Sequence, residues 1–137
     1  MKLVVATPER RVLSGIEVSS VTIPGEKGEM TILPGHATLL STLAIGILKF
    51  QFESGKTETA ALSRGFLRIH QDEVVVIADR FELAHEIDVE RAKRAREKAE
   101  QKLKAQEKFD EDMIKWREKL NRSLIRLEAS QFLLPPH

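Results

Sequence analysis

The sequence predicts an all-β sandwich domain followed by an antiparallel α-helical hairpin. Short apolar segments separated by turn residues fill the first 86 residues, which is typical of sandwiches built from many short strands. Residues 88–131 contain no glycine or proline and favour helix throughout. Asp88 stands between the two regions, where a helix N-cap belongs, with the acidic Glu90 in the first turn. We therefore expect a sandwich domain at 1–86 and a helical domain at 87–137.

The expected strands are short apolar segments bounded by glycine, proline or polar turns. They lie at residues 3–5, 12–13, 18–23, 30–33, 38–42, 45–52, 57–62, 66–69 and 74–77. No interval between them is long enough for a crossover helix, so we expect antiparallel pairing. Ser54-Gly55-Lys56-Thr57 is similar to the end of a phosphate-binding loop, but Phe50 stands where that loop needs a glycine. A hairpin turn is the better interpretation of this segment.

Two helices are expected, at residues 88–108 and 110–131, with the turn near Phe109 and with Asp110 or Asp112 as the second N-cap. The apolar seam of the first helix is Ala92, Ala95, Ala99 and Leu103, and that of the second is Met113, Leu120, Leu124, Leu127 and Gln131. Small side chains let the helices approach closely, which favours an antiparallel hairpin. Such a hairpin buries little apolar area, so we expect it to be marginally stable and to depend on the sandwich or on another protein. The tail 132–137 ends in prolines and is expected to fray.

Composition narrows the classes of function. The net charge of +1 gives no global attraction to nucleic acid, and no apolar run approaches the length of a membrane span. The chain has no cysteine, and its four histidines show no metal-ligand spacing. No set of nucleophile, base and acid can be assembled from the sequence. We therefore expect a protein that is not an enzyme and requires no cofactor.

The arginines give the strongest indication of a ligand site. Arg122 and Arg126 are four residues apart and share one helix face. If the hairpin turns near Phe109, Arg91 lies opposite position 126, and three guanidinium groups converge beside a helix N-terminus. That arrangement suits a phosphate group. The alternative is a solvated charged face. Its acidic partners would be Glu82, Glu86, Asp88, Glu90 and Glu128.

Several motifs resemble those of the epsilon subunit of rotary ATP synthases, which is called delta in mitochondria. The segment Gly28-Glu29-Met30-Thr31-Ile32-Leu33-Pro34-Gly35-His36 resembles that family's Gly-Glu-Leu-Gly-Ile-hydrophobic-Pro-Gly-His. Leu62-Ser63-Arg64-Gly65-Phe66-Leu67 is similar to its Leu-Ser-Gly-Gly-hydrophobic-Leu. Ile87, Asp88, Arg91 and Ala92 match a nucleotide-binding motif of some bacterial members. Thr31 and Arg64 replace family glycines, and Lys98 replaces an arginine of the nucleotide-binding members.

The resemblance implies a function in the central stalk. The sandwich would bind the gamma subunit and the c-ring loops, with Glu29 and His36 at the ring-facing end, and so couple proton flow to ATP synthesis. The hairpin would be a regulatory arm that blocks ATP hydrolysis when extended, through the acidic loop of the catalytic beta subunit. The protein would lie peripherally on the cytoplasmic face of the inner membrane.

The same resemblance implies ATP as a regulatory ligand. Its contacts would be Glu82, Asp88, Arg91, Ala92, Arg122 and Arg126, with the arginines on the phosphates and Ala92 leaving room for the ligand. Two other functions stay open on the residues alone. One is a free-standing nucleotide-sensing module, and the other is a sandwich adaptor whose hairpin binds a partner helix.

Overall fold

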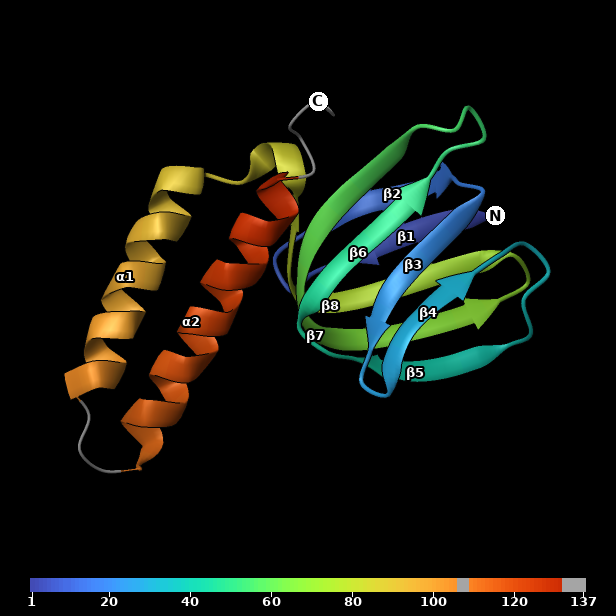
Figure 1. Ribbon diagram of the computed structural model, residues 1–137. Coiled ribbons are helices and arrows are strands. Elements are labelled where there is room, and N and C mark those ends of the chain that lie inside the picture. The colour runs from blue at the N-terminus through green and yellow to red at the C-terminus, as the bar shows by residue number, and fades with distance from the viewer. Residues whose placement is uncertain (106–108, 132–137) are drawn as a thin grey trace. The chain divides into compact units, whose positions relative to one another are not determined.

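The computed structural model describes residues 1–105 and 109–131, which form eight strands, one 3₁₀ turn and two α-helices (Figure 1). The elements are β1 (Lys2–Ala6), β2 (Arg11–Glu17), β3 (Ser20–Gly25), β4 (Gly28–Ile32), β5 (Leu39–Leu43), β6 (Gly46–Gln51), β7 (Thr57–His70), β8 (Glu73–Leu83), η1 (Ala84–Glu86), α1 (Val89–Ala105) and α2 (Glu111–Ser130). The predicted class, a β-sandwich followed by a helical hairpin, is confirmed. The predicted end of the first helix at 106–108 and the tail at 132–137 lie outside the described residues.

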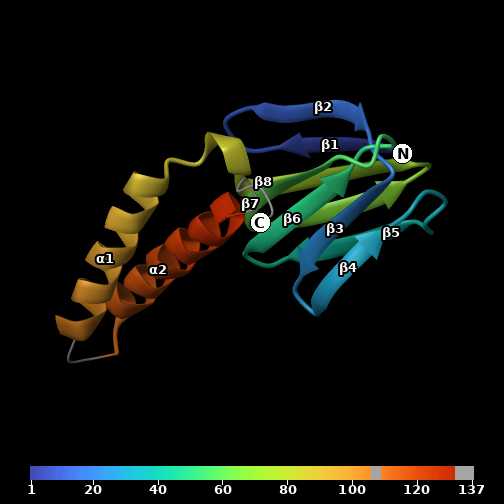
Figure 2. The same cartoon turned by 45° about the horizontal axis from the view of Figure 1, so that its top comes forward.

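The strands form a strongly bent sheet in which β3, β4 and β6 lie in front of β1, β7 and β8 (Figures 1 and 2). Strand β7 joins the layers, because its first half pairs with β6 and its second half with β5. The expectation of antiparallel pairing was wrong at one place: β1 and β8 are parallel. These are the first and last strands, so the intervening strands supply the long connection that parallel pairing requires.

A single strand, β7, replaces the two predicted at 57–62 and 66–69. The sequence analysis placed Gly65 in a break between these two strands. Gly65 instead lies inside β7 and faces the backbone of β8. A Cβ added at Gly65 would overlap the carbonyl oxygen of Ile77 and lie 2.8 Å from Cα of Ala78. Glycine is therefore required here by close approach of two backbones and not by a turn.

The core of the sandwich is built from alternate residues of both layers. The largest side chains buried there are Phe50, Leu3, Ile23, Ile32, Leu43, Leu48, Leu62, Leu67 and Ile69. Alternation along most strands sends these residues inward, whereas Thr59–Leu62 in the first half of β7 are buried on both sides. The core therefore belongs to the strand-rich part of the chain, as the sequence predicted.

The hairpin helices begin at the two predicted caps. The Asp88 carboxylate accepts the backbone N–H of Arg91 at 3.0 Å, and the Asp110 carboxylate accepts that of Met113 at 3.1 Å. Each carboxylate satisfies an amide that the first helical turn leaves without an intrahelical partner. Between the two candidates for the second cap, the structure selects Asp110.

The seams of the hairpin differ from the predicted ones. On α1, Ala92 and Ala99 of the predicted seam are fully buried, but Ala95 is exposed. Its neighbour Arg96 is half-buried instead. On α2, Leu124 is 43% exposed and Gln131 is exposed, whereas Ser123 and Ala129 are buried. The predicted seam of α2 is therefore correct in part: Met113, Leu120 and Leu127 are half-buried, but small residues occupy the fully buried positions, where two helices can approach most closely. The Ser123 hydroxyl donates to the carbonyl of Leu120 at 2.7 Å, which lets a polar residue be buried there.

Two compact units divide the chain between Leu83 and Ala84, three residues before the predicted boundary. The short η1 turn belongs to the helical unit because it packs with α2. Independent folding of the residues before position 87 stays a prediction.

Candidate functional sites

The first candidate site is the end of the hairpin where α1 begins and α2 finishes (Figure 1). Asp88, Arg91 and Ala92 form the first turn of α1, where the Asp88 carbonyl also accepts the N–H of Ala92 at 3.0 Å. Arg91 is exposed, while Ala92 is fully buried. Ala92 is therefore enclosed by neighbouring residues, and its role in leaving room for a ligand stays a prediction.

Arg122 and Arg126 lie one turn apart on α2 and are both half-buried. The convergence of these two arginines with Arg91 stays a prediction. The Asp88 carboxylate already occupies the N–H of Arg91 and adds negative charge there. A phosphate at this end would therefore be held mainly by guanidinium groups and less by free helix amides.

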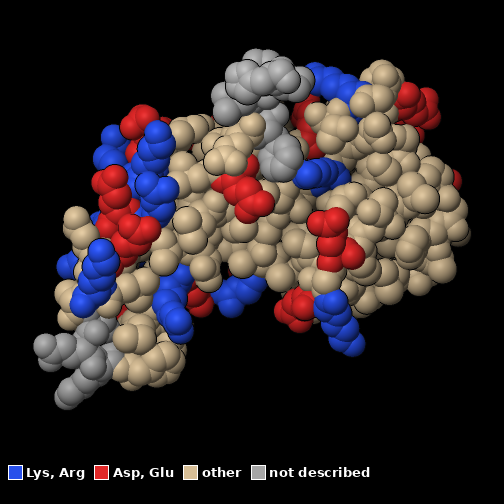
Figure 3. Space-filling view, viewed as in Figure 1, with Lys and Arg blue, Asp and Glu red and all other residues tan. Residues whose placement is uncertain are grey.

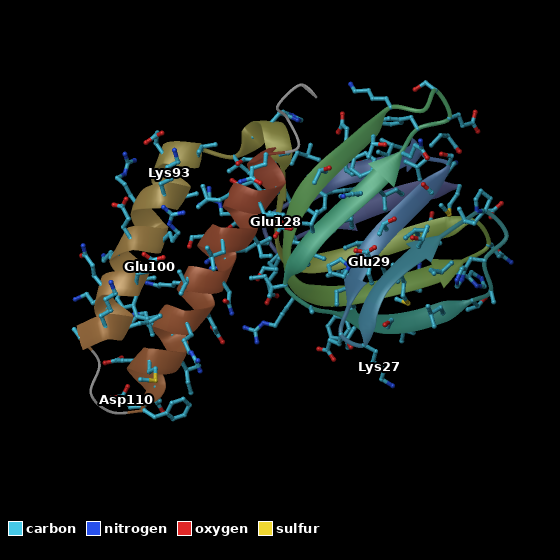
Figure 4. The ribbon with its side chains drawn as sticks, in the orientation of Figure 1. Lys27, Glu29, Lys93, Glu100, Asp110 and Glu128 are labelled. Atoms are coloured by element: carbon cyan, nitrogen blue, oxygen red, sulfur yellow. The ribbon has the colours of Figure 1, made fainter. Side chains whose placement is uncertain are left out.

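The acidic residues around these arginines keep the ion-pair alternative open. Glu90 contacts Lys93 at 3.8 Å, Glu86 contacts His85 at 4.0 Å, and Arg96 contacts Glu100 at 4.0 Å. Lys93 and Glu100 lie along α1 in Figure 4, where Glu128 lies on α2. Basic and acidic side chains are interspersed over α1 in Figure 3. Such exposed pairs are weak and involve other basic residues, so they do not decide between a phosphate site and a charged surface.

Glu82 does not belong to the helical unit. It is a half-buried residue of β8, opposite Ala61 of β7. Its predicted contact with a nucleotide stays a prediction.

The second candidate site is the loop between β4 and β5. The N–H of His36 donates to the carbonyl of Leu33 at 3.2 Å, closing a turn in which Gly35 has φ 81°. The N–H of Gly35 donates to the Asp72 carboxylate at 3.1 Å, which ties this loop to the β7–β8 turn. His36 is exposed, and its place in an interface with gamma or the c-ring stays a prediction.

Glu29 is exposed near the start of β4, directly after the β3–β4 turn that carries Lys27 (Figure 4). His36 follows the other end of β4. The two residues predicted to share one interface are thus separated by most of that strand. An interface that includes both must run along β4 and not only around one loop.

A third surface was missed by the sequence interpretation: an exposed apolar group on β5, β7 and β8. Leu40 is 75% exposed, Phe66 60% and Ile77 53%. Phe66 lies directly opposite Ile77, and Leu40 is diagonal to Phe66 across the β5–β7 pair. We call these three residues the apolar face.

The sequence does carry a signal for the apolar face. Leu39-Leu40, Phe66-Leu67 and Val76-Ile77 are pairs of consecutive apolar residues within strands. Because neighbouring side chains in a strand point to opposite sides, one member of each pair must point away from the core.

No metal site was found among the described residues: none of their histidine, aspartate and glutamate side chains gather in groups of three or more able to hold an ion. Within the same residues, neither helix has the length and apolar character needed to cross a membrane.

The architecture, a strand sandwich followed by a separate two-helix unit, defines the class of protein: a β-sandwich domain with a C-terminal helical hairpin. Two family models match this chain in succession: the ATP synthase delta/epsilon chain β-sandwich domain over residues 1–84 and the long α-helix domain of the same chain over 85–131. The chain therefore belongs to the ATP synthase epsilon subunit family.

Curated ATP synthase epsilon chains from other organisms align with most of this chain. An ATP synthase epsilon chain of Bdellovibrio bacteriovorus is 35% identical over 132 residues, covering 96% of this chain and 94% of its own. One from Geobacter sulfurreducens is 38% identical over 130 residues, covering 95% and 93%. One from Carboxydothermus hydrogenoformans reaches 52% identity over 103 residues, covering 75% of each.

Solved structures extend the comparison to three dimensions. A chain in the Euglena gracilis mitochondrial ATP synthase structure of OSCP, F1 and c-ring matches with a TM-score of 0.70 and 28% identity, covering 97% of this chain and 78% of that one. A chain from the Tetrahymena thermophila central stalk and c-ring structure shares the fold, with a TM-score of 0.58 and 15% identity over 95% of this chain and 96% of that one. This chain is thus structurally similar to central-stalk chains of ATP synthases.

Proposed function

We propose that the sandwich is a non-catalytic docking module of the central stalk, which binds the gamma subunit and the c-ring loops and couples proton flow to ATP synthesis. The observation that carries the proposal is the apolar face. Leu40, Phe66 and Ile77 leave large apolar side chains in water on neighbouring strands, and such contiguous patches mark protein–protein interfaces. The family and the F1 and c-ring context of a structural relative support the choice of partners.

The hairpin is the regulatory part of this proposal. Its basic residues suit an acidic loop of the catalytic beta subunit, and its extension along gamma would block ATP hydrolysis. The interface of α1 and α2 contains the small residues Ala92, Ala99 and Ser123, so its separation exposes less apolar surface than a leucine interface would. Two states of similar free energy are what a conformational switch needs. On this proposal the protein lies peripherally on the cytoplasmic face of the membrane.

ATP is proposed as the ligand that favours the closed hairpin. Arg91, Arg122 and Arg126 would hold the phosphates, and Asp88 would hold the first turn of α1 in place. Glu82 is an additional proposed contact.

Binding to gamma tests the docking role. Phe66→Lys adds a charge at the apolar face, and we expect it to weaken gamma binding in co-elution and calorimetry by about tenfold or more. Thr57→Lys adds the same charge at an exposed position of the same strand and should bind normally. If the wild-type chain does not bind gamma, a nucleotide-sensing module or an adaptor becomes the better interpretation of its function. Equal binding by Phe66→Lys would remove the apolar face from the interface.

A further inference from the structure

The helical unit contains one aromatic residue surrounded by lysines. Trp116 of α2 is the only tryptophan of the chain and is half-buried. Lys98 and Lys102 reach it from α1, with their Nζ atoms 5.7 and 5.9 Å from the ring centroid. Lys119 and Lys115 reach it from its own helix, at 4.6 and 5.9 Å. Trp116 is thus a point where side chains of both helices meet.

The two lysines of α1 contribute an attraction that depends on the helices being together. An ammonium group within about 6 Å of an indole centroid is attracted by the negative face of the ring. Ser123 lies two turns after Trp116, so the tryptophan shares the face of α2 that holds this buried serine. When the helices separate, Lys98 and Lys102 lose the ring, whereas Lys115 and Lys119 keep it.

We propose that Lys98 and Lys102 hold Trp116 as a cation–π latch that sets the balance between closed and open hairpin. The rest of the interface includes the small buried residues Ala92, Ala99 and Ser123 and the half-buried Leu103, Met113 and Leu120, so the latch adds to apolar packing in favouring closure. This inference deepens the regulatory role proposed for the hairpin and rests on it only for its biological meaning. The latch itself is a property of the isolated chain.

Closure of the hairpin by the latch should depend on salt concentration differently from closure by an ion pair. Every one of the four ammonium groups lies within 6 Å of one centroid, so any two lie within about 12 Å of each other and repel. Salt at physiological strength has a screening length of about 8 Å. It therefore weakens this repulsion more than the short-range attraction to the ring. Moderate salt should leave the closed hairpin as favoured as before or more so.

Thiol labelling measures opening directly, because the chain contains no cysteine. Ser123→Cys places a near-isosteric thiol at a position that is 2% exposed, so an alkylating reagent reacts only when the hairpin opens. In this background, Lys98→Met with Lys102→Met keeps the apolar stems and removes both charges. We expect labelling to become roughly five- to thirty-fold faster, because the loss of two exposed cation–π contacts shifts the equilibrium toward the open hairpin by about that factor. Lys93→Met with Lys104→Met removes two charges from the same helix away from the ring and should label at the parent rate.

A second set of variants, all carrying Trp116→Leu, tests whether the effect of the two lysines depends on the tryptophan ring. With Trp116→Leu, Lys98→Met together with Lys102→Met should leave the labelling rate unchanged or lower it, because the ring is gone and only the repulsion of these two ammonium groups by Lys115 and Lys119 is relieved. An equal acceleration with and without the tryptophan would overturn the latch, and so would no acceleration in the parent. The assay contains no ATP synthase, so its outcome is separate from that of any test of hydrolysis.

Discussion

Gly65 shows what single residues decide in this fold. It lies inside β7, where the backbone of β8 leaves no space for a Cβ. Gly65→Ala should lower the free energy of unfolding by about 1–3 kcal/mol through overpacking. Urea denaturation measures this, with His70→Ala, exposed on the same strand, as the control expected within about 0.5 kcal/mol of wild type. A Gly65→Ala protein of unchanged stability would contradict the close approach of the strands.

The predicted binding of ATP depends on Arg122 and Arg126. Calorimetry of the isolated chain should show ATP binding, and Arg122→Ala or Arg126→Ala should abolish most of the heat. At a hundredfold excess over Kd, a ligand of the closed form adds about 2.7 kcal/mol to its stability, enough to bias a switch of a few kcal/mol. Lys115→Ala removes a positive charge elsewhere on α2 and should bind ATP normally. No heat and no rise in melting temperature at millimolar ATP would leave these arginines as an ion-pair surface.

Sequence reasoning at the residue scale succeeded where local chemistry dominates. Asp88 and Asp110 were found because capping involves only the next three residues. Ala95 and Leu124 were placed wrongly because their exposure depends on how the helices approach one another. Residue periodicity alone does not fix that orientation, since an apolar stripe about 100° wide admits several.

At the scale of elements, the strands were located well and their pairing only in part. Turn chemistry marked the β7–β8 hairpin, where Gln71 and Asp72 both have positive φ. The parallel pairing of β1 with β8 joins residues more than 65 positions apart, and no local signal specifies it. The apolar face has a local signal in its pairs of consecutive apolar residues, but its three side chains form one group only once β5, β7 and β8 lie side by side.

The sandwich alone should fold. Its buried core lies within residues 1–83, so a chain ending at Glu86 retains all of it. We expect a cooperative thermal transition and a β-type circular dichroism spectrum. A chain ending at Ile77 removes the end of β8 with Phe81 and Leu83 and should be much less stable. A disordered spectrum for the chain ending at Glu86 would place the folding boundary further along.

At the scale of the whole molecule, the hairpin is expected to restrain ATP hydrolysis. Deleting residues 88–137 should raise ATP hydrolysis by the assembled enzyme while leaving assembly intact, because the docking surface lies on the sandwich. Full-length chain added to the same enzyme serves as the control. Equal rates of hydrolysis with both chains would mean that the arm has no inhibitory role.

The central claim is that this chain couples rotation of the c-ring to ATP synthesis. The most direct measurement is proton-driven ATP synthesis by vesicles containing an ATP synthase that lacks its own epsilon subunit. Adding this chain should restore synthesis, and Glu29→Lys should restore less of it while assembling equally well, because the charge reversal falls on the exposed start of β4. Synthesis that is the same with and without the chain, in particles shown to contain it, would contradict the account.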